Sequence, residues 1–247
     1  METNKHSLRL IPYEVRPGAL LMAADEAMLG SALKGQASLR FYGWSEATLS
    51  LGYFQHHGDR LNSPLLTDRP FVRRHTGGGA ILHHHELTYS LALPAGSPWH
   101  NEETWLCRFH HLLVKVLRGF GVESRAVICG EEKKLDPFLC FKHQTPGDLL
   151  INGHKVVGSA QRRPHGATLQ HGSILLQGSA YTPVLPGIAD LSGVQVGIKE
   201  LAAALQEELV RDTGWTLEAG DWTPEEIEET SRLEREKYGS PEWNLRR

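Results

Sequence analysis

Residues 148–163 read Asp-Leu-Leu-Ile-Asn-Gly-His-Lys-Val-Val-Gly-Ser-Ala-Gln-Arg-Arg, and they carry the clearest hairpin signal in the chain. Asn152-Gly153 separates two apolar runs, which is the pattern of a two-residue type I′ turn. A turn of that length places Leu150 opposite Lys155. We therefore predict an antiparallel hairpin at this position, within a sheet.

The face of the hairpin that carries Lys155 is the first candidate site. Side chains alternate between the two faces of a strand, so Lys155 is expected to lie with Leu150, Val157, Ser159 and Gln161. A lysine beside apolar neighbours and two hydrogen-bonding side chains fits a pocket for an acyl group or a carboxylate. A solvated lysine on an edge strand is the commoner outcome, and the hairpin alone leaves both interpretations open.

A glycine-rich segment is the second candidate site. Residues 73–91 read Arg-Arg-His-Thr-Gly-Gly-Gly-Ala-Ile-Leu-His-His-His-Glu-Leu-Thr-Tyr-Ser-Leu. The run Gly77–Gly79 lets the backbone approach a ligand with no Cβ in the way. The sequence contains neither GxxxxGK[ST] nor GxGxxG, so the usual nucleotide-binding loops are excluded. A flexible turn is the alternative, and the preceding Arg73 and Arg74 favour a binding site.

Two histidine-containing stretches follow. In His83-His84-His85, strand alternation puts His83 and His85 on one face, a pair that could bind zinc. No third ligand stands at a recognisable spacing, so we predict no metal site. His171-Gly172 interrupts a predicted strand, and the glycine indicates that another group packs closely against it.

The remaining pattern predicts an α+β fold, a mixed β-sheet flanked by helices. Apolar residues at helical spacing indicate helices over 17–33, 101–119 and 198–210, the second with Asn101 as its N-cap. Strand alternation adds segments over 39–43, 48–54 and 167–176.

The domain organisation is predicted to be simple. Residues 1–247 are expected to form a single catalytic domain with its core at about 8–215. Residues 221–247 contain eight acids and five bases. We therefore expect residues 216–247 to form an acidic, solvated helical extension.

The composition excludes several classes of protein. The 247 residues are 40% hydrophobic and 22% charged, with a net charge of −3, as in globular domains. No apolar run approaches the ~18 residues of a membrane span, and no broad basic surface is indicated. We therefore expect neither a membrane nor a nucleic acid as a partner. Three cysteines without a CxxC pair, and no signal-peptide pattern, predict a cytoplasmic protein.

Cys140 is the candidate nucleophile. It lies in a loop shortly before the Lys155 hairpin, whereas Cys107 lies beside the apolar stripe of a predicted helix and Cys129 has no obvious activating neighbour. A nearby cation lowers the pKa of a thiol from about 8.5. Cys140 and Lys155 would be a nucleophile and its activator if the fold brings them together. A thiol packed under a loop is the alternative.

These segments together resemble the lipoate–protein ligase/octanoyltransferase superfamily, which also contains the biotin–protein ligases. The resemblance rests on five segments in the expected order, residues 22–29, 49–55, 73–83, 152–163 and 169–176. It implies the biotin/lipoate ligase fold, a mixed sheet flanked by helices.

Within the superfamily, the chain is most similar to the cysteine-dependent octanoyltransferases of the LipM type. That branch carries its nucleophile in the loop before the hairpin, where Cys140 stands, and Glu86-Leu-Thr-Tyr-Ser also looks like that branch. The LipB type carries its cysteine after the His-Gly strand, where residues 177–187 contain none. Gly79 completes a triple glycine that resembles the ligases instead. A short lipoate–protein ligase that uses ATP and Mg²⁺, an octanoyl amidotransferase and a non-catalytic binding protein remain alternatives.

The resemblance implies an octanoyl-[acyl carrier protein]:protein N-octanoyltransferase that acts through a cysteine thioester in protein lipoylation, without a cofactor. The donor would be acyl carrier protein, and the acceptor a lipoyl domain such as glycine-cleavage H protein or dehydrogenase E2. Cys140 and Lys155 would be catalytic. The implied substrate-binding residues are Arg74, Thr76, Gly77, Gly78, Gly79, His83, Ser159, Gln161, His171 and Gly172.

Overall fold

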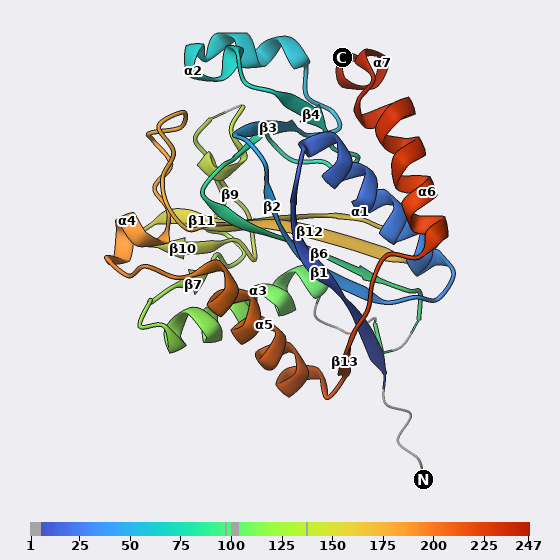
Figure 1. Ribbon diagram of the computed structural model, residues 1–247. Helices are drawn as coiled ribbons and strands as arrows, with labels where there is room; N and C mark the ends of the chain where they lie inside the picture. Colours follow the sequence, from blue (N-terminus) through green and yellow to red (C-terminus); the bar gives the residue numbers. More distant parts are fainter. Residues whose placement is uncertain (1–5, 97, 100–103, 137) are drawn as a thin grey trace.

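A mixed eight-stranded sheet forms the centre of the computed structural model, which describes residues 6–96, 98–99, 104–136 and 138–247 (Figure 1). The strand order is β13-β1-β2-β6-β12-β11-β10-β7. The first three strands in this order are parallel and all other neighbours are antiparallel. The strands are β1 (Ser7–Arg16), β2 (Ser38–Trp44), β6 (Glu86–Leu93), β7 (Arg125–Ala126), β10 (Leu149–Ile151), β11 (His154–Arg162), β12 (Thr168–Leu175) and β13 (Thr216–Ala219). The predicted mixed sheet is confirmed.

Two smaller sheets complete the β-structure. In the first, β3 (Thr48–Leu51) pairs with parallel β4 (Phe71–Arg73) and antiparallel β5 (Ile81–His83). Because β4 and β5 flank the glycine run, this sheet holds both ends of that loop. The second joins β8 (Lys133–Lys134) to β9 (His143–Gln144). Between β3 and β4 the chain forms a 3₁₀ turn, η1 (His57–Asn62), and α2 (Pro64–Thr67).

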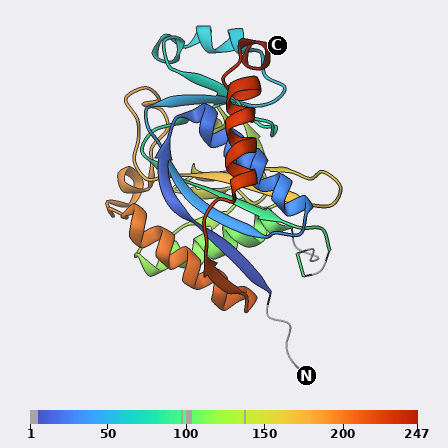
Figure 2. The ribbon, with the colours of Figure 1, turned by 45° about the vertical axis from the view of Figure 1, so that its right-hand side comes forward.

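Helices cover both faces of the large sheet (Figures 1 and 2). α1 (Gly18–Leu33), backed by α6 (Pro224–Leu233), lies on one face, and α3 (Trp105–Gly119) and α5 (Ile198–Thr213) pack on the other. The remaining short helices are η2 (Cys140–Lys142), α4 (Ile188–Ser192), the π-helical turn η3 (Glu234–Tyr238) and α7 (Pro241–Asn244). No helix in the described part of the chain is both long and apolar enough to cross a membrane.

The predicted helices match the structure closely, apart from one N-cap. α1 and α5 occupy the expected segments. Asn101, the expected cap of the second helix, lies outside the described residues. Thr104 caps α3 instead, because its hydroxyl oxygen accepts a hydrogen bond from the backbone N–H of Cys107.

The two faces of the large sheet differ in chemistry. On β2, Leu39 and Phe41 join the apolar core under α3 and α5. Arg40 and Tyr42 alternate with them, point toward α1 and are fully buried. Because side chains alternate along a strand, one face of the sheet is apolar and the other is polar and buried. The candidate site lies on the polar face.

The C-terminal segment differs from the expected solvated extension. Residues 216–219 form β13 of the large sheet, parallel to β1, so the boundary predicted at 215 falls inside the fold. α6 begins with a capping box made by Thr223 and Glu226. Leu233 and Tyr238 are then buried in a cluster with residues of α1 and β2. Most acids of this segment are exposed or half-buried, but Glu226 is buried and pairs with Arg9.

His110 ties α3 to the sheet. Its Nδ1 lies 2.5 Å from the carbonyl oxygen of Gly147, and its Nε2 lies 2.6 Å from the Ser159 hydroxyl. Burial lowers the pKa of His110 to about 4, because desolvation disfavours the imidazolium form. The folded protein therefore holds this ring neutral at neutral pH.

We expect His110 to make folding stability fall in mild acid. An unfolded histidine titrates near pH 6.5, so below that pH the unfolded chain binds a proton that the folded chain binds only near pH 4. The contribution of His110 to the free energy of unfolding is complete above pH 6.5 and falls by on the order of 1 kcal/mol per pH unit below it. Urea unfolding should be measured at pH of about 7.5, 6.5 and 5.5. The free energy of unfolding of the wild type should exceed that of His110→Gln by a smaller amount at the lowest pH. A constant difference would contradict this role.

Candidate active site

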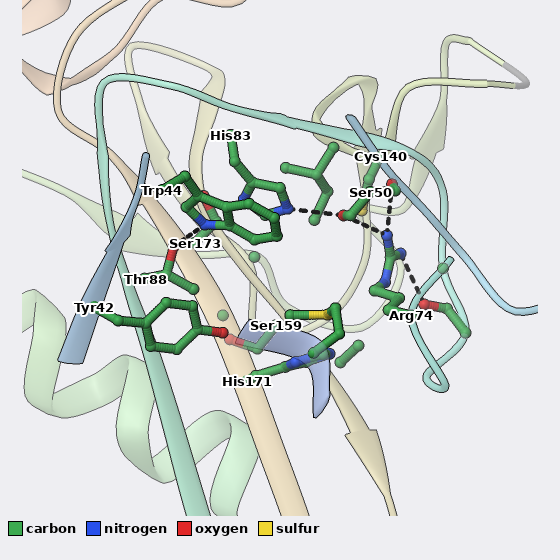
Figure 3. A pocket seen from close by; sticks show the side chains of 17 residues that line it. Tyr42, Trp44, Ser50, Arg74, His83, Thr88, Cys140, Ser159, His171 and Ser173 are labelled. Atoms are coloured by element: carbon green, nitrogen blue, oxygen red, sulfur yellow. Dashed lines mark hydrogen bonds between the residues drawn. The ribbon is translucent and has the colours of Figure 1, made fainter. Parts of the chain in front are cut away.

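A pocket opens on the polar face of the sheet, beside α1 (Figure 3). Its apolar walls come from Met22, Tyr42, Trp44 and Ile81. Eight of the twelve predicted site residues line it: Arg74, Gly77, Gly78, His83, Cys140, Ser159, His171 and Gly172. The other four, Thr76, Gly79, Lys155 and Gln161, do not. Three of these four still contact the lining residues, and only Gln161 points away.

The hairpin that carries Lys155 contains a bulge that the sequence did not reveal. Leu150 pairs with Lys155 as predicted, and Asn152 and Gly153 adopt the positive φ of a type I′ turn. The register then shifts, because Leu149 pairs with Val157 and leaves an extra residue on β11. Every side chain after the bulge therefore lies on the opposite face from the one expected.

Consequently, the expectation that Lys155 shares a face with Ser159 and Gln161 is wrong. Lys155 lies on the side of Gly158, where an added Cβ would be only 2.5 Å from Lys155 Cε. Ser159 Oγ instead lies 2.7 Å from the Tyr89 hydroxyl, toward α3. Gln161 donates a hydrogen bond to Gln170 on that same side.

Cys140 and Lys155 do meet. Lys155 Nζ lies 3.8 Å from Cys140 Sγ and 2.7 Å from Asp148 Oδ2. Lys155 and Asp148 are both buried, and Asp148 also accepts hydrogen bonds from the backbone N–H and the hydroxyl of Thr145. Lys155 and Asp148 thus form a buried ion pair. The sulfur atom at the pocket wall therefore faces a fixed positive charge.

The glycine loop packs closely against the Cys140 segment and is joined to it by backbone hydrogen bonds. The backbone N–H of Cys140 donates to Ala80 O at 2.8 Å, and the N–H of Ala80 donates to Phe138 O at 2.8 Å. An added Cβ at Gly79 would lie 2.9 Å from both the N and the Cα of Cys140. Gly79 is therefore required by the close approach of these two segments, and its presence does not by itself indicate a ligase.

Arg74 fixes the shape of the glycine loop. Its guanidinium donates to the carbonyl oxygens of Gly77 and Gly79 at 2.9 and 2.6 Å, and to Ser50 O at 2.9 Å. Burial lowers the pKa of Arg74 to about 10, so it still carries its charge at neutral pH. Arg74 thus places a second positive charge at the pocket.

His83 belongs to a chain of hydrogen bonds along the pocket wall (Figure 3). Arg74 donates to the hydroxyl of Ser50 at 3.0 Å, that oxygen lies 2.7 Å from His83 Nε2, and His83 Nδ1 lies 2.6 Å from Glu86. Burial lowers the pKa of His83. Its neutral ring therefore donates to Glu86 and accepts from Ser50. Trp44 stacks on the ring at 3.8 Å between centroids.

His171 connects the loop to the buried centre of the protein. Its Nε2 lies 2.7 Å from the Thr76 hydroxyl, and its Nδ1 lies 2.8 Å from Asp25 Oδ2. The expected close approach at Gly172 comes from Ser159 and Tyr89, since an added Cβ would lie 2.3 and 2.6 Å from them. His171 thus serves the pocket, and Gly172 makes room for a contact on the other face.

Sequence reasoning missed two acids. Asp148 stands just before the hairpin, and a buried lysine needs a counterion, which is the one signal that could have identified it. Asp25 interrupts the apolar residues of α1, and an acid on the buried side of a helix requires a partner. Both carboxylates are buried in ion pairs.

The three consecutive histidines do not form the face that alternation predicts. β5 ends at His83, and His84 and His85 lie in the following turn with their ring centroids 3.6 Å apart and the ring planes tilted by 30°. Among the described residues, no group of three or more His, Cys, Asp or Glu side chains could hold a metal ion.

A family comparison agrees with this geometry. Residues 17–211 match the lipoyl protein ligase A/B catalytic domain. The chain belongs to this family. The matched range contains every residue of the pocket described above, including Cys140, Lys155 and the glycine loop.

Individual octanoyltransferases are also similar in sequence to this chain. The chain is 34% identical to octanoyltransferase LipM of Kyrpidia tusciae, over 97% of this chain and 98% of the relative. It is 32% identical to octanoyltransferase LipM of Bacillus subtilis, over 98% and 99%. Both relatives are matched over nearly their full length.

Solved structures of lipoate–protein ligases share the fold. Lipoate-protein ligase A bound with ATP superimposes with a TM-score of 0.79 at 22% identity, over 97% of this chain and 98% of the other. A bipartite lipoate protein ligase from Thermoplasma acidophilum, described with its E2 lipoyl domain, gives a TM-score of 0.73 at 21% identity, over 98% and 97%. The predicted biotin/lipoate ligase-like fold is confirmed.

We expect Gly79→Ala to displace the Cys140 segment. The new Cβ would collide with backbone atoms at 2.9 Å, and overpacking of this kind costs about 1–3 kcal/mol. In a Cys107→Ser, Cys129→Ser background, the substitution should lower the melting temperature and change the rate at which iodoacetamide alkylates Cys140. Gly77→Ala is the matched control, since its added Cβ would meet nothing within 4 Å. If both alanine variants behaved alike, Gly79 would not support the Cys140 segment.

Proposed function

We propose that this protein transfers an octanoyl group from acyl carrier protein to a lysine of a lipoyl domain, through a thioester on Cys140. One observation carries the proposal. A thiol lies at the wall of a mostly apolar pocket, with the ammonium of Lys155 3.8 Å from its sulfur. The likeness to the LipM octanoyltransferases over nearly the whole chain supports the same reaction.

In the first step, Cys140 Sγ attacks the carbonyl carbon of the octanoyl thioester. A new carbon–sulfur bond to Cys140 forms, the bond to the carrier's thiol breaks, and the proton lost by Cys140 passes to the departing thiol. One thioester replaces another, so no ATP is needed and no cofactor is implied. Lys155 stabilises the negative charge on sulfur as it develops.

In the second step, the acceptor lysine attacks the acyl-enzyme as a neutral amine. A carbon–nitrogen bond forms, the bond from carbon to Cys140 Sγ breaks, and a proton of the amine passes to the sulfur. Lys155 is paired with Asp148 at 2.7 Å and lies beside this sulfur. Its role is to stabilise the Cys140 thiolate, which attacks in the first step and leaves in the second.

The described pocket suits the acyl chain. Met22, Tyr42, Trp44 and Ile81 supply apolar walls, as a site for an apolar chain requires. The acceptor would be a lipoyl domain, in keeping with the E2 lipoyl domain described with the Thermoplasma ligase.

Cys140→Ser should abolish both the acyl adduct and the transfer. Incubation with octanoyl-acyl carrier protein, followed by intact-mass spectrometry, should show a hydroxylamine-labile octanoyl adduct on the wild type and on Cys129→Ser, but none on Cys140→Ser. Loss of the nucleophile should slow transfer by at least about 10²-fold. If Cys140→Ala instead transferred free octanoate or lipoate in the presence of ATP, the protein would be a ligase. If octanoyl-H protein alone served as the donor, it would be an amidotransferase.

Lys155→Met should slow adduct formation by about 10²-fold, since a preorganised charge at the reacting sulfur is lost. It should also destabilise the fold by about 3–5 kcal/mol, because Asp148 is left buried and unpaired. The double variant Lys155→Met, Asp148→Asn separates the two effects. It should regain most of the lost free energy of unfolding, because no unpaired charge stays buried, but its rate of adduct formation should stay low. Recovery of the rate in the double variant would show that Lys155 acts only through the structure.

A further inference from the structure

A cluster of arginine side chains and aromatic rings lies on the surface next to the glycine loop. Arg246 packs 3.9 Å from the centre of the Tyr53 ring and 4.5 Å from that of Trp243. Arg247 lies 5.5 Å from the ring of Phe54, which is 66% exposed. We call this the arginine–aromatic patch, made of Tyr53, Phe54, Arg162, Trp243, Arg246 and Arg247.

The patch holds three arginines, and Glu236 and Glu242 line a groove beside it together with Trp243 and Arg246. Within the part of the chain that the structure describes, none of its three arginines forms an ion pair with a carboxylate. Arg162 is exposed and donates to the carbonyl oxygen of His75 at 3.3 Å. The Arg246 hydrogen bond, with the charges of Arg246, Arg162 and Arg247, holds the pKa of Tyr53 below its usual value. All three cations therefore act on one tyrosine.

A fourth cation lies beneath the patch. Arg73 is fully buried, and its guanidinium donates to backbone carbonyl oxygens alone among the described residues. These acceptors are the carbonyls of Gly52, Tyr53, Gln55, Trp243 and Asn244. Carbonyl dipoles solvate this charge without cancelling it. A chain whose net charge is −3 thus gathers positive charge at this point of its surface.

The patch is continuous with the pocket. The backbone N–H of Tyr53 donates to Thr76 O at 2.9 Å. Gly52 lies directly against the pocket-lining Gly78, since an added Cβ at Gly52 would be 1.9 Å from Gly78 O. A partner held on the patch is therefore adjacent to the loop that borders Cys140.

We propose that the arginine–aromatic patch docks the acidic face of the acyl carrier protein that donates the octanoyl group. This inference rests on the proposed function. Exposed aromatic rings with arginines are the residues that dominate protein interfaces, and a cationic patch attracts an anionic partner. A carrier that delivers its thioester on a phosphodiester-linked arm brings negative charge to this surface.

The test compares donors with and without the carrier. In the double variant Arg162→Glu, Arg247→Glu, we expect the KM for octanoyl-acyl carrier protein to rise about tenfold or more, with the KM for the lipoyl-domain acceptor unchanged. Turnover of octanoyl-pantetheine, which has neither phosphate nor protein, should match the wild type and shows that the site is intact. Added NaCl should raise the KM of the wild type for octanoyl-acyl carrier protein toward that of the variant, because salt screens exposed charges.

Arg118→Glu is the matched control, an exposed arginine at the end of α3 on the opposite face of the sheet. It should leave the KM for the carrier unchanged. An unchanged KM in the double variant, an equal loss with both donors, or the same loss in Arg118→Glu would each overturn the docking surface. Direct titration with octanoyl-acyl carrier protein separates this inference from the proposed function: salt-sensitive binding that the double variant loses supports the patch even if no octanoyl transfer occurs.

Discussion

Asp25 is the side chain on which the arrangement of the site depends. Its buried carboxylate accepts hydrogen bonds from Arg40 and Ser90 and lies 2.8 Å from His171 Nδ1. Burial alone would raise its pKa, yet Arg40 and His171 hold the pKa of Asp25 well below its usual value. A buried charge that loses a partner costs about 3–5 kcal/mol, so these partners must all be in place together. One carboxylate therefore fixes α1 against β2, β6 and β12.

The polar face of the sheet follows from this constraint. The buried charged and polar side chains under α1 need hydrogen-bond partners, which the apolar side chains under α3 and α5 do not need. The pocket lies among these polar side chains. His171 extends the same network from Asp25 to Thr76, at the base of the glycine loop. Arg74 then holds that loop by its carbonyl oxygens. The centre of the fold and the rim of the site are thus parts of one hydrogen-bonded structure.

Two glycines allow the reacting groups to come together. Gly79 lets the Cys140 backbone rest on the loop, and Gly158 leaves the space that Lys155 occupies. Lys155, paired with Asp148, and the buried Arg74 then place positive charge around the sulfur of Cys140. Positive charge continues from the pocket to the surface at the arginine–aromatic patch.

The sequence by itself determined the local elements, the family, and most of the residues around the pocket. Asn152-Gly153 specified the turn because few residues tolerate its backbone angles. The face on which Lys155 lies was decided only by the tertiary structure, because the bulge beside Val157 depends on how β10 pairs with β11 and on no local signal. The partners of Asp25 and Asp148 are likewise long-range contacts. The C-terminal acids suggested a solvated helix, yet the buried Tyr238 packs on α1, since composition reports charge and burial depends on which face finds a partner.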